Sequence, residues 1–381
     1  MVNIIYRHYR KGDEEQLADL FNRSFQTNGF SFIRTKKNWK WRYFQSPEFE
    51  PEMIQIAEDL DCKKIVGMVC INPIEKIKFN DKIYLNGNIN DVSCHPDYRR
   101  QGISKKLMQK SIDYMQQKGC DLSLLTAAFN GFPRKNLYPK LGYNDFERVA
   151  GYISFPNFSR LLRDFPLSLV LLPALIIFSF IPRLIMRIYM RKSSFIKEYS
   201  YRIEYNTNHR EFLISSDRIL KNYYVGYPIE RKGYPNWARI RVPSKRHKPT
   251  YIVIKKKNKI IGGVILTHLN TYSFKYGLKL RIGITHELFL DTTQLLDEKE
   301  VRFAYSYLID KVLKAATYRS VGVLLINTST KNYLLKNSLK LYNFFKFQDI
   351  SLMLLKLKND LKLQKQEKFC FIPTYLSLGF P

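Results

Sequence analysis

The sequence has few cysteines, and none of them stands in a pattern that binds metal or builds a disulfide framework. The five cysteines include no CxxC pair, and no histidine lies at metal-ligand spacing from them. An odd number of cysteines behind an N-terminus without a secretory signal is typical of reduced, intracellular thiols. We therefore expect a cytoplasmic protein with no structural metal.

Acidic residues are scarce relative to basic ones, and the imbalance is concentrated in one part of the chain. The 381 residues include 63 lysines and arginines against 33 aspartates and glutamates, for a formal charge of +30. Residues 1–160 carry 25 basic and 18 acidic residues (+7), whereas residues 161–381 carry 38 and 15 (+23). The second part therefore suits an anionic partner. Because no nucleic-acid-binding motif accompanies the charge, we do not expect that partner to be a nucleic acid.

Long uncharged stretches are also rare, and only residues 165–182 (FPLSLVLLPALIIFSFIP) form one. As a helix this stretch would extend ~27 Å, and its prolines would break it. Arg183, Arg187 and Arg191 follow at four-residue spacing, which puts them on one helical face where they could contact lipid phosphates. We expect peripheral contact with the inner, anionic membrane face through residues 165–192. A helix buried between domains and a single membrane span are the alternatives.

The pattern of strands and helices predicts an α+β fold with a mixed, mostly antiparallel sheet. Residues 54–57 and 65–72 read as a hairpin, residues 89–94 as a strand, and residues 103–115 as an amphipathic helix. A similar order recurs later in the chain, with little sequence identity. We therefore expect a first domain over residues 1–158 and a second domain over residues 199–360. An apolar and basic linker helix (159–198) would join them, and a C-terminal tail (361–381) would pack back onto the body of the protein.

The most informative segment joins the predicted strand at 89–94 to the helix that follows. It reads Arg99-Arg100-Gln101-Gly102-Ile103-Ser104. The N-terminus of a helix offers unpaired N–H groups to an anion, and a glycine lets the backbone approach that anion closely. The loop therefore predicts a pyrophosphate site made mainly of backbone donors, although a capped surface helix with solvated arginines is the alternative. Neither a P-loop nor a GxGxxG motif occurs.

This loop resembles the signature [QR]-x-x-G-x-[GA] of the GNAT superfamily, the GCN5-related N-acetyltransferases, with Ser104 in place of the last small residue. The wider run VSCHPDYRRQGISKKLM and the later LYPKLGY resemble two-domain relatives of the enhanced-intracellular-survival type, or tandem acetyltransferases with a degenerate second copy. The matching motifs cover about residues 85–150. The resemblance implies the GNAT fold and acetyl-CoA as the donor substrate. By this resemblance the donor would be bound through Val92, Cys94, Arg99, Arg100, Gln101, Gly102, Ile103, Ser104, Lys105 and Asn130.

For the chemistry, the resemblance places a tyrosine near the CoA sulfur, and Tyr138 in YPKLGY fits that position as the general acid. The general base is harder to assign. Asp91 on the strand before the loop is our first candidate, with His95 and the terminal carboxylate of Pro381 as alternatives, and solvent could also take the proton. The aromatic segment NWKWRYF could flank an acceptor, although such a segment is more often core.

The second copy lacks the glycine loop. Residues 285–300, THELFLDTTQLLDEKE, contain no glycine and five acidic residues, which would repel a pyrophosphate. We therefore assign catalysis to the first domain. The prediction is an acetyl-CoA-dependent N-acetyltransferase acting on an amine acceptor, such as an amino-sugar or envelope precursor at the cytoplasmic membrane face. The alternatives are a soluble acyltransferase for small amines or protein lysines, and a non-enzymatic basic protein that binds membrane or nucleic acid.

Overall fold

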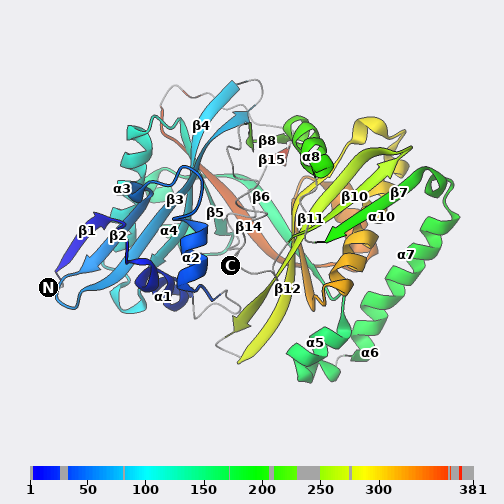
Figure 1. The fold of residues 1–381 in the computed structure, drawn as a ribbon, viewed down its shortest axis with the longest axis horizontal. Helices are drawn as coiled ribbons and strands as arrows, with labels where there is room; N and C mark the ends of the chain where they lie inside the picture. The colour runs from blue at the N-terminus through cyan, green and yellow to red at the C-terminus, as the bar shows by residue number, and fades with distance from the viewer. Residues whose placement is uncertain are drawn as a thin grey trace.

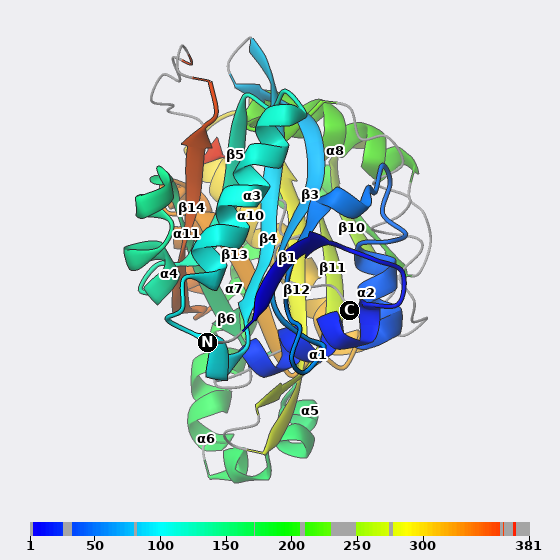
Figure 2. The ribbon, with the colours of Figure 1, turned by 90° about the vertical axis from the view of Figure 1, so that its left-hand side faces the viewer.

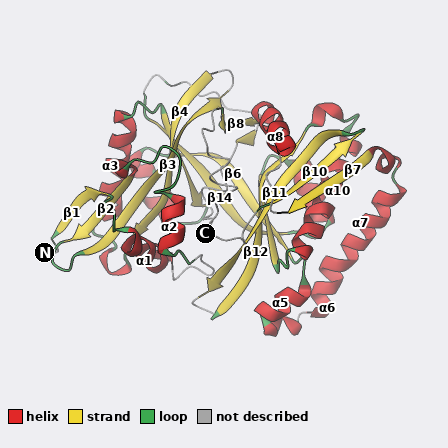
Figure 3. Cartoon of the chain, viewed as in Figure 1, coloured by secondary structure: helices red, strands yellow, loops and turns green. Residues whose placement is uncertain are grey.

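One mixed β-sheet runs through the molecule, with helices on its faces (Figure 1, Figure 3). This computed structural model describes residues 3–25, 33–79, 82–170, 172–205, 210–229, 249–273, 277–358, 361 and 369–370. The described strands form a 13-stranded sheet in the order β1-β2-β3-β4-β5-β14-β6-β13-β12-β11-β10-β7, with β9 beside β3. The predicted α+β fold class is confirmed.

The first half of the sheet contains the predicted hairpin. Its strands are β1 (Ile4–His8), β2 (Ile54–Asp59), β3 (Lys64–Phe79), β4 (Lys82–Cys94) and β5 (Leu122–Ala128). The strands from β1 to β4 pair antiparallel, whereas β5 pairs parallel to β4. A parallel pair needs a crossover connection, and α3 (Ile103–Gln117) supplies it by packing against β2, β3 and β4 (Figure 2).

The second half repeats this arrangement. β7 (Tyr199–Tyr205), β10 (Thr250–Lys256), β11 (Lys259–Ser273) and β12 (Leu278–Leu290) pair antiparallel, and β13 (Val323–Ser329) pairs parallel to β12. The crossover is α10 (Glu298–Tyr318), which packs against β10 and β11. The architectural repeat seen in the sequence is therefore present in the strand pairing.

The two halves are joined by the exchange of their last strands. β14 (Phe345–Lys356), from the end of the second half, lies between β5 and β6 (Asn144–Ser154) of the first half. β6 in turn pairs with β13 on its other side. The predicted boundaries near residues 158, 198 and 360 stay predictions, because a sheet with this strand order continues through both halves.

The aromatic segment before β2 belongs to the core. α1 (Glu14–Phe25) and α2 (Lys36–Arg42) pack against each other, and α1 packs on β3 and β4. Trp39 and Trp41 are buried, with exposed fractions of 0% and 2%, and Trp39 stacks on Tyr9. These tryptophans stabilise α2 rather than flank an acceptor.

The segment after β6 forms a series of helices, of which α5 and α6 lie at the lower end of the molecule in Figures 1 and 2 and α7 runs up the right-hand side in Figure 1. Its helices are α5 (Phe158–Asp164), α6 (Leu172–Leu175), a π-helical turn (Ile176–Phe180) and α7 (Ile181–Lys192). Among the described helices, none combines the length and apolar character that a membrane crossing requires.

The predicted exposed basic face of α7 is wrong for Arg183. Its guanidinium is buried and donates to the Ser154 hydroxyl at 3.0 Å and to the carbonyl of Phe155 at 2.8 Å. Burial lowers the pKa of Arg183 to about 10, with the charge of Arg187 adding to the effect. Arg187 pairs with Asp310 of α10 at 2.7 Å. The arginines at four-residue spacing therefore define a helical face that turns partly toward protein.

Six further α-helices and strands belong to the described chain. They are α4 (Phe132–Asn136), α8 (Arg210–Tyr223), β8 (Tyr224–Val225), β9 (Tyr227–Pro228), α11 (Tyr333–Leu341) and β15 (Phe369–Cys370). β15, from the predicted tail, pairs parallel with β8. The terminal carboxylate of Pro381, which was an alternative general base, lies outside the described residues.

Candidate active site

The turn between β4 and α3 has an unusual backbone. β4 ends at Cys94, and a 3-10 turn over Pro96–Tyr98 follows, in which the N–H of Tyr98 donates to the carbonyl of His95 at 3.0 Å. Arg100 and Gly102 then both adopt left-handed conformations, with φ of 66° and 79°. Successive N–H groups in such a turn can converge on one anion.

α3 begins without a side-chain cap at Gly102. The first N–H groups of a helix have no partner inside the helix. Within the described part of the chain, the amides of Gln101, Ile103, Ser104 and Lys105 donate to no other protein group. A Cβ built on Gly102 would meet no atom within 4 Å, so the space in front of the turn is open. The helix start can therefore accept an anion.

Cationic side chains surround this helix start. Arg99, Arg100 and Lys105 are exposed, and Arg99 also donates to the carbonyl of Ser24 at 2.7 Å, which ties the loop to the end of α1. These charges add to the partial positive charge of the helix N-terminus. The backbone N–H groups at the helix start and the three cationic side chains beside it are therefore suitable donors for a diphosphate group.

β4 and β5 pair over only part of their length. Their register ends at Ile89 opposite Leu125, although β4 continues through Val92 to Cys94. A bulge at Asp91, which has a φ of 48°, accompanies this divergence. The last residues of β4 therefore make no backbone hydrogen bonds to β5. We expect the pantetheine arm to lie at this edge, beside Val92 and Cys94.

The Cys94 thiol faces the same loop. Burial raises its pKa, and a hydrogen bond with Ser104 and the charge of Arg99 only partly offset this effect. The thiol therefore stays protonated near neutral pH, and nothing in its surroundings prepares it as a nucleophile.

Tyr138 lies on the same side of the sheet as α3. It is buried in one hydrophobic cluster with Ile103 and Leu107 of α3, and its ring contacts Tyr143 edge-on at 6.2 Å between centroids. Burial raises the pKa of the Tyr138 hydroxyl, so the phenol keeps its proton at neutral pH and has one to donate. Asn130, by contrast, is exposed in the turn after β5.

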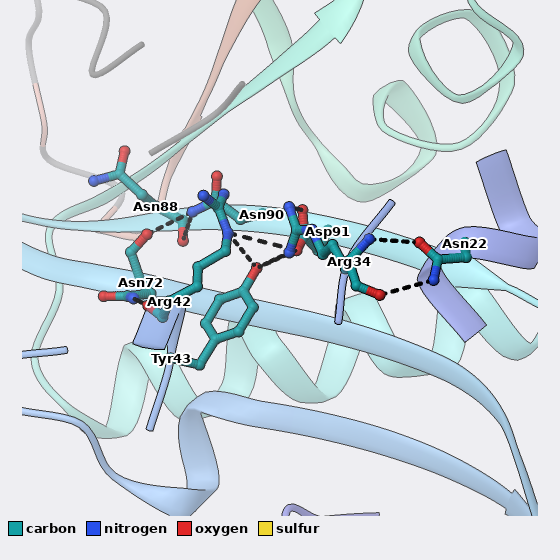
Figure 4. A network of polar contacts seen from close by, with 8 residues as sticks. All are labelled: Asn22, Arg34, Arg42, Tyr43, Asn72, Asn88, Asn90 and Asp91. Carbon is teal, nitrogen blue, oxygen red and sulfur yellow. Dashed lines mark hydrogen bonds and ion pairs between the residues drawn. The ribbon is translucent and has the colours of Figure 1, made fainter. Parts of the chain in front are cut away.

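Asp91 faces the connection between α1 and α2 and belongs to a polar network (Figure 4). Arg34 pairs with its carboxylate, the Tyr43 hydroxyl donates to the same group, and Arg42 lies 3.7 Å from it. The network extends to Asn22, which exchanges two hydrogen bonds with the backbone of Arg34 at 2.8 and 2.9 Å. These contacts anchor the bulge of β4 to α2, and the role of Asp91 as a general base stays a prediction.

His95, the other candidate base, is buried and lies 3.0 Å from the Lys64 ammonium, measured from Nε2 to Nζ. Burial and the Lys64 charge lower the pKa of the imidazole. It caps the 3-10 turn by accepting from the N–H of Asp97, so its contacts are those of a structural residue.

Sequence reasoning missed the partners of Asp91. Arg34, Arg42 and Tyr43 lie within a dozen residues of one another, but they are about fifty residues from Asp91 in the chain. The available signal was two arginines beside a buried aromatic run, which implies a carboxylate partner because buried guanidinium groups are paired. The sequence could not say which carboxylate this is.

The start of α10 in the second half is closed by the protein itself. Asp297 caps the helix by accepting from the N–H of Glu300 at 2.8 Å. The Glu300 carboxylate accepts from the N–H of Leu296 at 2.7 Å and pairs with Lys256 at 2.8 Å. Within the described residues, no group of three His, Cys, Asp or Glu side chains could hold a metal ion in either half.

With this geometry in view, similarity to known proteins identifies the first half. Residues 5–145 match the family described as an acetyltransferase (GNAT) domain. The chain contains a GNAT acetyltransferase domain. Over 113 residues the chain is 30% identical to N-alpha-acetyltransferase 30 of Saccharomyces cerevisiae. This match covers 29% of this chain and 62% of the yeast protein. The chain is also 24% identical over 152 residues to an uncharacterized N-acetyltransferase of Methanocaldococcus jannaschii. That match covers 39% of this chain and 63% of the archaeal protein.

The chain thus spans about three fifths of the length of these curated relatives. Solved structures extend the likeness beyond the GNAT domain. N-myristoyltransferase of Saccharomyces cerevisiae with bound myristoyl-CoA matches with a TM-score of 0.69 and 14% identity, covering 98% of this chain and 90% of that one. A GCN5-related N-acetyltransferase from Anabaena variabilis matches with a TM-score of 0.55 and 13% sequence identity. The match covers 93% of this chain and 73% of that one. The fold likeness therefore includes both halves, and the relation to the enhanced-intracellular-survival type stays a prediction.

Proposed function

We propose that this protein is an acyl-CoA-dependent N-acyltransferase whose donor is acetyl-CoA and whose chemistry takes place in the first half. The observation that carries the proposal is the open start of α3. There, amides without a protein partner, the open space at Gly102 and three exposed cationic side chains could bind a diphosphate. The GNAT domain match over residues 5–145 supports this assignment.

In the proposed reaction a neutral amine attacks the thioester carbonyl carbon, a C–N bond forms, and the C–S bond breaks. The leaving thiolate takes a proton, for which the buried Tyr138 phenol is the proposed donor. The amine loses its own proton to Asp91 or to solvent. Gln101 to Lys105 would hold the diphosphate, while Val92 and Cys94 would line the pantetheine arm.

We propose that the acceptor is an amine on an amino-sugar or envelope precursor at a membrane face. The support for this choice is the strongly basic second half, which suits anionic sugar nucleotides and anionic lipids. The fold likeness to N-myristoyltransferase makes a longer acyl chain the alternative donor to be compared with acetyl.

The test is CoA binding and turnover by the full chain. Gly102→Glu should reduce CoA affinity at least 100-fold, since a carboxylate at the helix start repels the diphosphate. Gly119→Glu is the matched control, because Gly119 has a similar φ of 75°, also has no atom within 4 Å of a built Cβ, and ends α3 instead of beginning it. Equal CoA affinity of the two variants would overturn the site.

Turnover is measured as thiol release from acetyl-, octanoyl- and myristoyl-CoA with a panel of amino sugars, sugar nucleotides and peptides. Tyr138→Phe should lower kcat by about 10²-fold, in the range of a lost general acid, with little change in KM. Tyr333→Phe, at an exposed position, is the control. CoA binding without turnover on any amine would favour the non-enzymatic alternative.

A further inference from the structure

α7 has two opposite faces, and only one of them is packed. Arg183, Met186 and Met190 are buried on the inner face, where the two methionines join the core around α10. Ser179, in the preceding π-helical turn, is buried as well. Spacings of three and four residues place these side chains on one side of the helix.

The other side of the segment is apolar and open to solvent. Ile181, Leu184, Ile185 and Ile188 are 42%, 47%, 58% and 46% exposed, and their spacing defines a single stripe. Further exposed apolar residues continue it toward α5. We define the outer face as the exposed residues Leu169, Val170, Ile176, Ile177, Phe180, Ile181, Leu184, Ile185, Ile188 and Tyr189.

An exposed apolar stripe of this length differs from the isolated exposed side chains of ordinary proteins. A contiguous exposed apolar patch marks an interaction site. The other exposed large apolar residues of the described chain, for example Leu296, Leu341 and Phe347, lie singly or in pairs on separate elements. The outer face therefore needs a partner to cover it.

Charge identifies the kind of partner. From residue 165 to residue 197 the sequence has no acidic residue, and exposed basic residues follow the apolar stripe at Arg191, Lys192 and Lys197. A second copy of a chain with a formal charge of +30 would be repelled from this basic end. An anionic lipid surface offers both an apolar interior and phosphates for the cations.

We propose that the outer face inserts into the interfacial region of an anionic bilayer, with α7 lying along the membrane and Arg191 and Lys192 on lipid phosphates. The inner face stays packed on the core around α10, and the half-exposed Arg187 adds an ion pair with Asp310 of that helix. The membrane contact itself does not depend on the proposed function. Only its biological role rests on that function, because docking would hold the acyltransferase beside an amine carried by the envelope. It keeps the membrane contact that the sequence predicts, but it leaves Arg183 in the protein, where that side chain is buried.

The experiment is sedimentation of the full chain with vesicles of phosphatidylcholine alone or of phosphatidylcholine with phosphatidylglycerol. Leu184→Glu, Ile185→Glu and Ile188→Glu combined should reduce the partition coefficient at least about ten-fold, because charges replace apolar side chains in the interface. The matched control combines Leu296→Glu, Leu341→Glu and Phe347→Glu, which are exposed apolar positions outside the outer face. The control should bind like wild type, and binding should be stronger on the anionic vesicles.

Equal partitioning of the two triple variants would overturn the proposal. Sedimentation velocity provides the second arm, since a wild-type dimer that the first triple variant converts to a monomer would assign the outer face to a second copy. CoA binding separates this inference from the proposed function. The triple variant should bind CoA like wild type, and Gly102→Glu should bind vesicles like wild type, so each idea can fail alone.

Discussion

The two halves of the molecule build the same strands and then treat the following helix in opposite ways. At the start of α3 there is no side-chain cap, and the amides from Gln101 to Lys105 have no protein partner within the described chain. At the start of α10, the Asp297 carboxylate accepts from the N–H of Glu300, and the buried Glu300 carboxylate accepts from the N–H of Leu296. A strand–turn–helix unit therefore offers an anion site only if the protein's own carboxylates leave its amides open.

The halves agree in the strand that precedes each helix. Asp91 in β4 and Glu287 in β12 both lie at irregularities of the pairing, and both have left-handed backbone, with φ of 48° and 49°. Both side chains are acidic and largely buried. The bulge is thus common to the two halves, whereas the open helix start belongs to the first half alone.

The strongest test of the shared bulge is Asp91→Ala. Removing this carboxylate leaves Arg34 and Arg42 buried without one of their partners, which should cost about 3–5 kcal/mol in the free energy of unfolding. Urea unfolding followed by circular dichroism measures the change. Asp97→Ala, at a side chain that is 80% exposed, is the control and should change stability by less than about 0.5 kcal/mol. Similar values for the two variants would show that the bulge needs no ion pair.

A second test concerns the closed helix start of the other half. Glu300→Gln keeps the shape of the side chain and removes the charge that faces Lys256, so we expect a loss of about 1–3 kcal/mol in unfolding free energy. Burial acts to raise the pKa of Glu300, but Lys256, the Leu296 N–H and Tyr199 outweigh it and lower the pKa.

The sign of the pH dependence follows from that shift. A lowered pKa in the folded state contributes stability above the unfolded pKa, and this contribution is lost as pH falls through the folded pKa. Wild type should therefore lose stability more steeply on acidification below about pH 4.3 than Glu300→Gln does. Parallel curves of unfolding free energy against pH would contradict the ion pair.

The smallest expected effect is that of Asp297→Ala, which removes the cap of α10. The loss of one capping hydrogen bond should cost about 1 kcal/mol of unfolding free energy. It should leave CoA affinity unchanged and create no second CoA site, because Glu300 still occupies the Leu296 amide. Calorimetric titration that gave two CoA molecules per variant chain would contradict the proposed difference between the two helix starts.

Local patterns were sufficient for much of the fold. The turn residues between β2 and β3 predicted a hairpin, and the apolar spacing from Ile103 to Met115 predicted α3, because both signals depend on neighbours in the chain. The glycine loop before α3 was also visible, since left-handed backbone at Gly102 is a property that glycine permits.

Other features depended on contacts between distant residues. The insertion of β14 between β5 and β6 has no local signal, because hydrophobic alternation fixes which side of a strand is buried and not which strand lies beside it. The pairing of Arg34 and Arg42 with Asp91 is of the same kind.

Three features of chemical character follow directly from the order of the amino acids: a helix start with a glycine in the first half, acidic residues at the matching place in the second half, and an uncharged segment that ends in basic residues. Packing in three dimensions sets which groups those features contact. Packing against α10 buried one face of α7 and left the other apolar face exposed, and strand exchange joined the two halves in one sheet. Composition and spacing set what each residue can bind, whereas only the packed chain determines which side of a helix faces protein and which faces solvent.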